Sequence, residues 1–392
     1  MAVPVPAPGA AGDVLRTAVR RLDLVRFRCY GGLALAVDDR TVVLTGPNGA
    51  GKTNLLEAVS FLTPGRGLRR ARLAEVAKNG SPEGWAVSAE VESAGERVRI
   101  GTGCLPGTDG AVPDKRSVRM DGAPMRTLAD LGRVLPLLWL TPAMDRLFTE
   151  GAGQRRRFLD RMVNAFDPGH AERAGAYARA LRERAVLLKD GRRDDAWLAS
   201  LEAVMAAQGT AVAAARLDLV LRLAPLARAG FGPFPGAEIS LAGSLEEALA
   251  AGDSALAVEE GFRARLAAAR AADAQAGVAT EGPHRTDLLA VHAEKGVAAR
   301  LASTGEQKAL LLGLVLAQAR LLAGGGRVPP VLLLDEVAAH LDERRRAALF
   351  DVLTDFPGQA WLSGTDAQLF APLRGRARFL AVLDAAVTED GV

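Results

Sequence analysis

Cysteine is scarce in this chain, and so are aromatic residues and long apolar runs. Only Cys29 and Cys104 occur among 392 residues, which excludes a disulfide framework or a cysteine-rich metal site and indicates a reducing, cytoplasmic compartment. No uninterrupted apolar run approaches the roughly 18 residues of a membrane span, so we expect no membrane partner. Aromatic residues make up 5% of the chain and are scattered, which argues against a stacking platform for single strands and favours contact with a duplex backbone.

The chain also lacks a strong excess of charge of either sign. A net charge of +3 neither requires nor excludes nucleic acid, so any such contact must come from local clusters. Hydrophobic residues account for 49%, which is typical of a globular protein with a sizeable core. The Pro- and Ala-rich start has no basic region leading into an apolar core. We therefore expect residues 1–19 to form a disordered tail and not a signal peptide.

What the chain does contain is a phosphate-binding loop. Residues 46–53 read GPNGAGKT and match G-x-x-x-x-G-K-[ST] at every fixed position, between an apolar strand-like segment and a helical pattern that a chance match would lack. Glycines let backbone N–H groups face phosphate oxygens, and the following helix adds its positive end. Lys52 can then reach the β- and γ-phosphates, and the Thr53 hydroxyl can ligate Mg²⁺. The residues expected to bind ATP are Gly46, Pro47, Asn48, Gly49, Ala50, Gly51, Lys52, Thr53 and Asn54.

A pair of acids much later in the chain indicates what kind of P-loop protein this is. Four apolar residues, 331–334, end in Asp335 and Glu336. Such a run suits a strand buried on both faces of a parallel sheet, and open α/β sheets bind ligands at the carboxyl ends of their strands. We expect Asp335 to hold Mg²⁺ with Thr53, and Glu336 to be the catalytic base that deprotonates the attacking water, with Lys52 as the second catalytic residue. The alternative is a core strand that ends in a surface acid pair.

A third motif lies between the other two and precedes an apolar helix expected over residues 309–322. A small hydroxyl, a glycine and a helix N-terminus together can hold a second phosphate. An ordinary helix cap of the capping-box type explains the same residues, and both interpretations can hold at once. The motif consists of Ser303, Thr304, Gly305, Glu306, Gln307 and Lys308.

The order of these three motifs resembles that of ABC-type ATPases, and His340, Leu341 and Asp342 resemble the D-loop of that superfamily. Transporter ATPases usually carry Leu-Ser-Gly-Gly-Gln, whereas residues 302–308 read ASTGEQK and are similar to the RecF family. Further segments that resemble RecF elements are FRCY at 27–30, QRRRFLD at 154–160, GPHRTD at 282–287 and LDEV at 334–337. These motifs extend over nearly the whole chain.

The resemblance to RecF implies an α/β fold: a P-loop ABC-type ATPase head, with a mixed sheet flanked by helices, and an inserted, mainly helical arm. It implies an ATP-dependent homodimer that clamps duplex DNA beside single-strand gaps, with the Ser303 motif of one subunit closing on the ATP of the other. It also implies a weak, DNA-stimulated ATPase that acts with RecO and RecR to promote RecA loading, recombinational repair and SOS induction.

Composition along the chain agrees with a discontinuous head. Residues 20–150 look rich in strands, residues 151–276 are rich in Ala, Leu and Arg with helical periodicity, and residues 277–392 return to strands and helices. The interval from Lys52 to Ser303 is too short for the long coiled coils of Rad50 and SMC proteins. Another SMC- or Rad50-like repair ATPase remains the alternative, followed by an ABC transporter subunit.

Two family positions have no clear match. Residues 141–145 occupy the expected place of the Q-loop, and Thr365 that of the switch histidine, whose absence favours slow hydrolysis. His284 and His340 are expected to be structural.

Clustered arginines are the candidates for sequence-independent contact with DNA phosphates. The alternative is a solvated helix face with acidic partners such as Asp160, Glu183, Asp194 and Asp195. A cluster at Arg182, Arg184, Arg192 and Arg193 is a further possibility. The expected DNA contacts are Arg66, Arg69, Arg70, Arg72, Arg155, Arg156 and Arg157.

Overall fold

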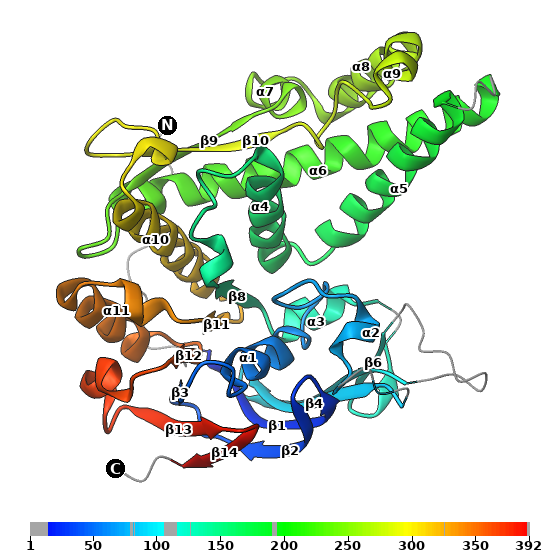
Figure 1. Ribbon diagram of the computed structural model, residues 1–392. Helices are drawn as coiled ribbons and strands as arrows, with labels where there is room; N and C mark the ends of the chain where they lie inside the picture. The colour runs from blue at the N-terminus through cyan, green and yellow to red at the C-terminus, as the bar shows by residue number, and fades with distance from the viewer. Residues whose placement is uncertain are drawn as a thin grey trace.

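The computed structural model describes residues 15–78, 81, 83–105, 116–125, 127–189, 194–324 and 326–389, and of His340 only the backbone. Two six-stranded sheets lie at one end of the molecule, and a group of long helices rises from them (Figure 1). The expected tail through residue 14, and Arg192 and Arg193, fall outside the described residues.

The first sheet is antiparallel, with the strand order β2-β1-β4-β5-β6-β7. β4 alternates strictly between buried and half-buried residues, as expected for a sheet that packs on one face only. Residues 17–19, which we expected in the tail, instead begin β1, because they pair with β4 at Ser93, Glu92 and Val91. The strands are β1 (Thr17–Phe27), β2 (Tyr30–Ala36), β4 (Trp85–Ser93), β5 (Glu96–Cys104), β6 (Ser117–Met120) and β7 (Ala123–Pro124).

The second sheet has the order β14-β13-β3-β12-β11-β8 and is parallel except for β14. Every residue of β3, β8, β11 and β12 is buried, which explains why their sequences lack polar alternation. Because β3 and β11 are parallel and separated only by β12, the P-loop and the two acids emerge at one edge. The bounds are β3 (Thr41–Thr45), β8 (Leu137–Leu140), β11 (Val331–Leu334), β12 (Ala360–Gly364), β13 (Ala377–Leu383) and β14 (Ala386–Glu389).

Two hydrophobic cores lie on opposite faces of this parallel sheet. Val42 and Leu44 of β3 face a core shared with α1 (Lys52–Ser60) and the antiparallel sheet, whereas Val43 faces a core shared with α10 (Thr304–Ala323) and α11 (Glu343–Asp355). Leu55 of α1 is fully buried between the two sheets, and truncating it to Ala should cost about 2–5 kcal/mol. The P-loop helix α1 is therefore packed between the two sheets.

The helical part contains α5 and α6, which run side by side away from the sheets (Figure 1). By length and composition α6 is apolar enough to cross a membrane, but 50% of the relevant window is buried, and the helix packs against α5, α8 and β9. β9 pairs with β10 across the boundary that we expected at residue 276. The elements are α4 (Ala152–Phe166), α5 (His170–Lys189), α6 (Asp195–Ala229), β9 (Ala237–Ala242), α7 (Ser244–Ala250), α8 (Ala255–Ala268), α9 (Arg270–Ala276) and β10 (Asp287–His292).

Short helices complete the connections around the sheet edges. They are α2 (Leu73–Val76), α3 (Ala129–Val134), η2 (Pro142–Met144), η3 (Ala299–Leu301), η4 (Val337–His340) and η5 (Ala367–Leu373).

Candidate nucleotide-binding site

The loop between β3 and α1 depends on glycine at three positions. Gly46, Gly49 and Gly51 have φ values of 140°, 81° and 118°, which side chains rarely allow. A Cβ on Gly46 would lie 2.1 Å from the carbonyl oxygen of Val382, and one on Gly51 would lie 2.6 Å from the hydroxyl of Tyr30. Gly49 has nothing within 4 Å, so it faces open space. The loop is closed on its protein side and open where a phosphate would approach.

Lys52 folds back over this loop. Its Nζ donates to the carbonyl oxygens of Gly46 at 2.7 Å and Pro47 at 2.8 Å. Burial lowers the pKa of Lys52, while the charges of Glu336 and Asp335 oppose that shift. The ammonium group therefore stands between the loop and the two acids.

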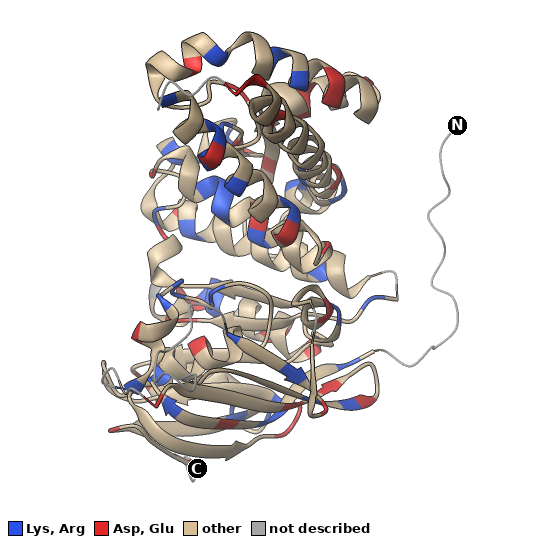
Figure 2. Ribbon diagram, turned by 90° about the vertical axis from the view of Figure 1, so that its right-hand side faces the viewer, with Lys and Arg blue, Asp and Glu red and all other residues tan. Residues whose placement is uncertain are grey.

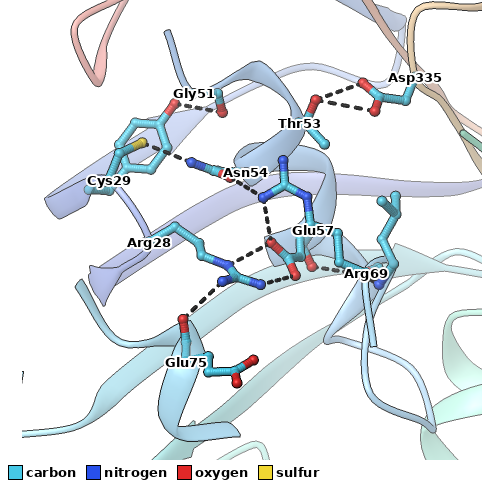
Figure 3. A network of polar contacts seen from close by, with 12 residues as sticks. Arg28, Cys29, Gly51, Thr53, Asn54, Glu57, Arg69, Glu75 and Asp335 are labelled. Carbon is cyan, nitrogen blue, oxygen red and sulfur yellow. Dashed lines mark hydrogen bonds and ion pairs between the residues drawn. The ribbon is translucent and has the colours of Figure 1, made fainter. Parts of the chain in front are cut away.

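Thr53 and Asp335 meet although 282 residues separate them. The Thr53 hydroxyl lies 3.0 and 3.1 Å from the two carboxylate oxygens of Asp335, at the upper right of Figure 3. Ser363, at the end of β12, donates to Asp335 at 2.6 Å. Oxygen atoms of this kind suit Mg²⁺, which takes few protein ligands and completes its shell with water and phosphate. The described residues contain no cluster of three or more His, Cys, Asp or Glu suited to a metal, so this two-residue site fits magnesium better than a closed metal cage.

Glu336 has a strained backbone. Its φ of 52° and ψ of 23° place it in the left-handed region, which costs about 1–3 kcal/mol for a residue other than glycine. Its N–H donates to the Ser363 hydroxyl at 2.9 Å, so one serine holds both acids. Thr365, which we expected in the place of the switch histidine, follows two residues later and is exposed.

A cavity adjoins the acids and brings three segments together. It is lined by Asp335 and Glu336, by Thr141 and Asp145 from the segment expected to replace the Q-loop, and by Lys308 of α10. Asp335 N–H donates to the carbonyl of Leu140 at 2.9 Å, and Lys308 pairs with Asp145 at 2.8 Å. The segment after β8 is therefore tied to the acids and to the third motif.

The third motif caps α10 as a capping box. The Ser303 hydroxyl and N–H donate to the Glu306 carboxylate at 2.8 and 2.9 Å, and the Glu306 N–H donates back to Ser303. An ion pair with Lys295 and these bonds from Ser303 lower the pKa of Glu306 to about 2. A Cβ on Gly305 would meet nothing within 4 Å. Among described residues, none of 303–308 bonds to the P-loop residues 46–54, and Ser303, Thr304 and Gly305 are exposed.

A polar network supports the P-loop helix from behind (Figure 3). Arg28 binds the fully buried Glu57 through two nitrogens at 2.8 and 2.6 Å, and Arg69 donates to Asn54 at 2.8 Å and contacts Glu57 at 3.5 Å. Asn54 donates in turn to the sulfur of Cys29 at 3.1 Å. Glu57 was not predicted, and its only signal in the sequence is a carboxylate within the apolar face of α1.

The segments at 154–160 and 282–287 hold each other. Arg155 binds Asp287 through two bonds of 2.7 and 2.8 Å, and Arg156 donates to the carbonyl of Thr286 at 2.8 Å. Asp160 accepts two bonds from Arg216, which also donates to Pro283 O at 2.6 Å. These two motifs therefore fasten α4 to the strand β10.

Histidines and other expected residues have structural partners. His284 Nδ1 is hydrogen-bonded to the Tyr177 hydroxyl at 2.7 Å, and burial lowers its pKa. Asp342 of the D-loop caps α11, Leu341 is buried, and the side chain of His340 lies outside what the structure describes. Arg184, considered for DNA contact, is instead buried between Glu202 and Asp273, so it cannot reach a duplex.

Comparison with known proteins gives concordant matches. The model of the RecF/RecN/SMC N terminal domain family matches residues 18–360. The DNA replication and repair protein RecF of Allorhizobium ampelinum is 51% identical over 371 residues, which are 94% of this chain and 98% of the relative. RecF of Mesorhizobium japonicum is 51% identical over 379 residues, 96% of this chain and 99% of the relative.

Solved structures agree on the fold. The recombination mediator protein RecF-ATPrS in the RecFOR pathway has a TM-score of 0.83 at 21% identity, covering 96% of this chain and 99% of that one. An Smc head domain derived from Pyrococcus furiosus, bound to part of ScpA, has a TM-score of 0.51 at 15% identity, covering 95% of each chain. At such identities the likeness shows a common head fold and no more.

Proposed function

The chain belongs to the RecF family of DNA replication and repair proteins, and from that premise we propose that it is an ATP-gated homodimeric clamp for duplex DNA beside single-strand gaps. The observation that carries the proposal is the meeting of Thr53 with Asp335, next to a buried lysine and a backbone-strained glutamate. In the proposed organisation, residues 20–150 and 277–392 form the ATPase head and residues 151–276 the arm.

The residues of the P-loop and of the acid pair have separate roles in binding and hydrolysing ATP. Backbone N–H groups of residues 46–54 and the first turn of α1 bind the phosphates. When ATP binds, Lys52 gives up its hydrogen bonds to the carbonyl oxygens of Gly46 and Pro47 and donates to phosphate oxygens. Thr53 and Asp335 hold Mg²⁺, which when bound balances phosphate charge. Glu336 takes the proton of the attacking water, and the bond from its N–H to Ser363 keeps its side chain at the edge of the site.

The clamp closes through the third motif. Ser303, Thr304, Gly305 and the first turn of α10 meet the γ-phosphate bound to the partner subunit, because an exposed helix N-terminus attracts an anion. The D-loop residues 340–342 follow the acids and lie at the same interface. ATP binds this closed dimer more tightly than the open one, so loss of the γ-phosphate favours opening.

The DNA-related roles follow from the family. Members are DNA replication and repair proteins, and one solved relative is described as a recombination mediator of the RecFOR pathway. We propose that this chain likewise acts with RecO and RecR to promote RecA loading and SOS induction. Hydrolysis is weak and stimulated by DNA, in keeping with the absence of a histidine at the expected switch position, Thr365.

The test is the mass of the protein in solution with and without ATP, on wild type, Lys52→Met, Ser303→Arg and Glu336→Gln, repeated with gapped duplex DNA. We expect ATP to drive dimerisation of the wild type, Lys52→Met and Ser303→Arg to abolish it, and Glu336→Gln to trap a dimer that retains DNA. Arg265→Gln, at an exposed pair with Glu281 on α8, is the matched control and should dimerise normally. A wild type that stays monomeric with ATP and DNA would overturn the clamp.

A further inference from the structure

Several of the arginines expected to contact DNA are already engaged by the protein. Arg69 binds Asn54 and Glu57, Arg155 binds Asp287, and Arg156 donates to the carbonyl of Thr286. These contacts fix their guanidinium groups in the fold. Among the described arginines that have no carboxylate partner are Arg66 and Arg70 after α1, and Arg157 and Arg161 on α4.

Arg161 is the most unusual of the four, because it is half-buried without any acid. Its guanidinium lies over the ring of Trp139 at 4.8 Å and near that of Phe158 at 5.3 Å. Its one polar contact is a bond to the sulfur of Met144 at 3.2 Å. Aromatic faces stabilise a cation by about 0.5–2 kcal/mol but leave its charge uncompensated. Burial and the charge of Arg70 lower the pKa of Arg161 to about 9.

The connection after α1 lies beside the end of α4, because a Cβ on Gly132 would be 3.2 Å from Pro168 and 3.6 Å from Pro64. At this junction, burial and the charges of Arg157 and Arg66 lower the pKa of Arg70. Arg157 and Arg161 are four residues apart on one helix, where like charges are unfavourable. The charge of Asp160 opposes this shift in the pKa of Arg70, but Asp160 is engaged by Arg216 and His170. Figure 2 shows Lys and Arg segments on both sides of the junction between the sheets and the helices.

The backbone adds a second cost at the same place. Arg70 has a φ of 55°, in the left-handed region that is unfavourable for residues other than glycine. Strain and like-charge repulsion both disfavour this arrangement in the isolated protein. A bound anion removes the repulsion, since guanidinium groups match the geometry of phosphate oxygens.

We propose that Arg70, Arg157 and Arg161, with Arg66 at the edge, form a site for one phosphate of the DNA backbone at the junction of the α1–α2 connection and α4. The inference rests on the proposed function and names where the duplex is gripped. The site reads no sequence, because a contact to a backbone phosphate carries no information about the base. A phosphodiester of DNA and a phosphate of free nucleotide share this chemistry, and the test separates them.

The experiment measures the affinity for duplex DNA with ATP present, as a function of salt, for Arg70→Gln, Arg157→Gln and Arg161→Gln. Because these arginines share one phosphate, each variant should reduce the slope of log affinity against log salt by up to about 0.9. Affinity for a fluorescent ATP analogue, measured without DNA, should be unchanged. Arg265→Gln carries the same change of charge at a paired arginine and should keep the wild-type slope.

Three results overturn the site. One is a wild-type slope in all three variants. Another is weakened ATP affinity with an unchanged DNA slope, which would mean that the nucleotide is the ligand. The third is a lower Tm of Arg70→Gln without DNA. Removal of an exposed arginine that is repelled by its neighbours should leave the Tm equal or higher, whereas removal of an arginine that stabilises the fold would lower the Tm. If the wild type does not bind duplex DNA with ATP, the proposed function itself is wrong. If the wild type binds DNA and the three variants bind it equally well, only the phosphate site is wrong.

Discussion

Asp160 should stabilise the folded protein by an amount that follows from the shift of its pKa. The carboxylate accepts bonds from Arg216 at 2.9 and 3.1 Å and from His170 at 2.9 Å, where α4 meets α5 and α6. Burial alone would raise its pKa, but the hydrogen bond from His170 and the charge and hydrogen bonds of Arg216 lower it to about 2 from 3.8. Asp160→Asn keeps the shape and removes the charge.

The size of the effect follows from linkage. A difference of about two pKa units between unfolded and folded states corresponds to about 2.5 kcal/mol. Because the folded pKa is the lower one, this stabilisation is fully present above about pH 4–5 and is lost as the pH falls toward 2. The side chain is 28% exposed, so solvent screening makes 2.5 kcal/mol an upper value, and we expect a loss of about 2 kcal/mol at pH 7.

The assay is urea unfolding of the wild type and Asp160→Asn at several pH values. The difference in free energy of unfolding should be constant from pH 8 to pH 5 and shrink below pH 4. Asp218→Asn, at an exposed pair with Arg222 on α6, is the control and should cost less than about 0.5 kcal/mol. Equal stability of wild type and Asp160→Asn at pH 7 would refute the reasoning, as would a difference that grows between pH 5 and pH 8.

Three further predictions concern single contacts. Gly51→Ala should abolish nucleotide binding, because its φ of 118° and the Tyr30 hydroxyl leave no room for a Cβ, whereas Gly49→Ala should weaken binding less; equal losses in equilibrium dialysis would contradict the geometry. Ser363→Ala should lower the kcat of ATP hydrolysis with little change in ATP affinity, since it releases Asp335 and Glu336, and a change in affinity alone would point to a different role. Arg184→Met should lower the free energy of unfolding by about 3–5 kcal/mol, because it leaves two buried carboxylates; a loss below 1 kcal/mol in chemical unfolding would show that Arg270 compensates.

The parts of the site that the sequence predicted are those whose geometry is local. The P-loop is encoded within eight consecutive residues, and the two acids follow directly from a buried strand. The meeting of Thr53 with Asp335 also followed, because parallel strands end at one edge of a sheet. The resemblance to RecF, drawn from short segments, was confirmed by relatives that align over nearly the whole chain.

Contacts that depend on tertiary packing could not be predicted. The contact of Ser363 with Asp335 depends on where β12 ends relative to β11, which the sequence around Ser363 does not show. Arg155 and Arg161 are both arginines on one helix, yet one is neutralised by Asp287 and the other has no acid. Only the packing of α4 against β10 and β8 separates them. Residues 17–19 resembled a tail because their partners on β4 lie far along the chain.

The position of β3 in its sheet has a consequence for synthesis on the ribosome. The two strands that flank the P-loop strand are β12 and β13, which begin at Ala360 and Ala377. The hydrogen bonds of β3 to its neighbours can therefore form only with residues that are translated more than 300 residues later. Contacts between residues so far apart in sequence raise the contact order and slow folding. A nascent chain that already contains the P-loop and the whole of α4–α10 lacks both neighbours of that strand, so it should acquire nucleotide binding only when its last segments emerge.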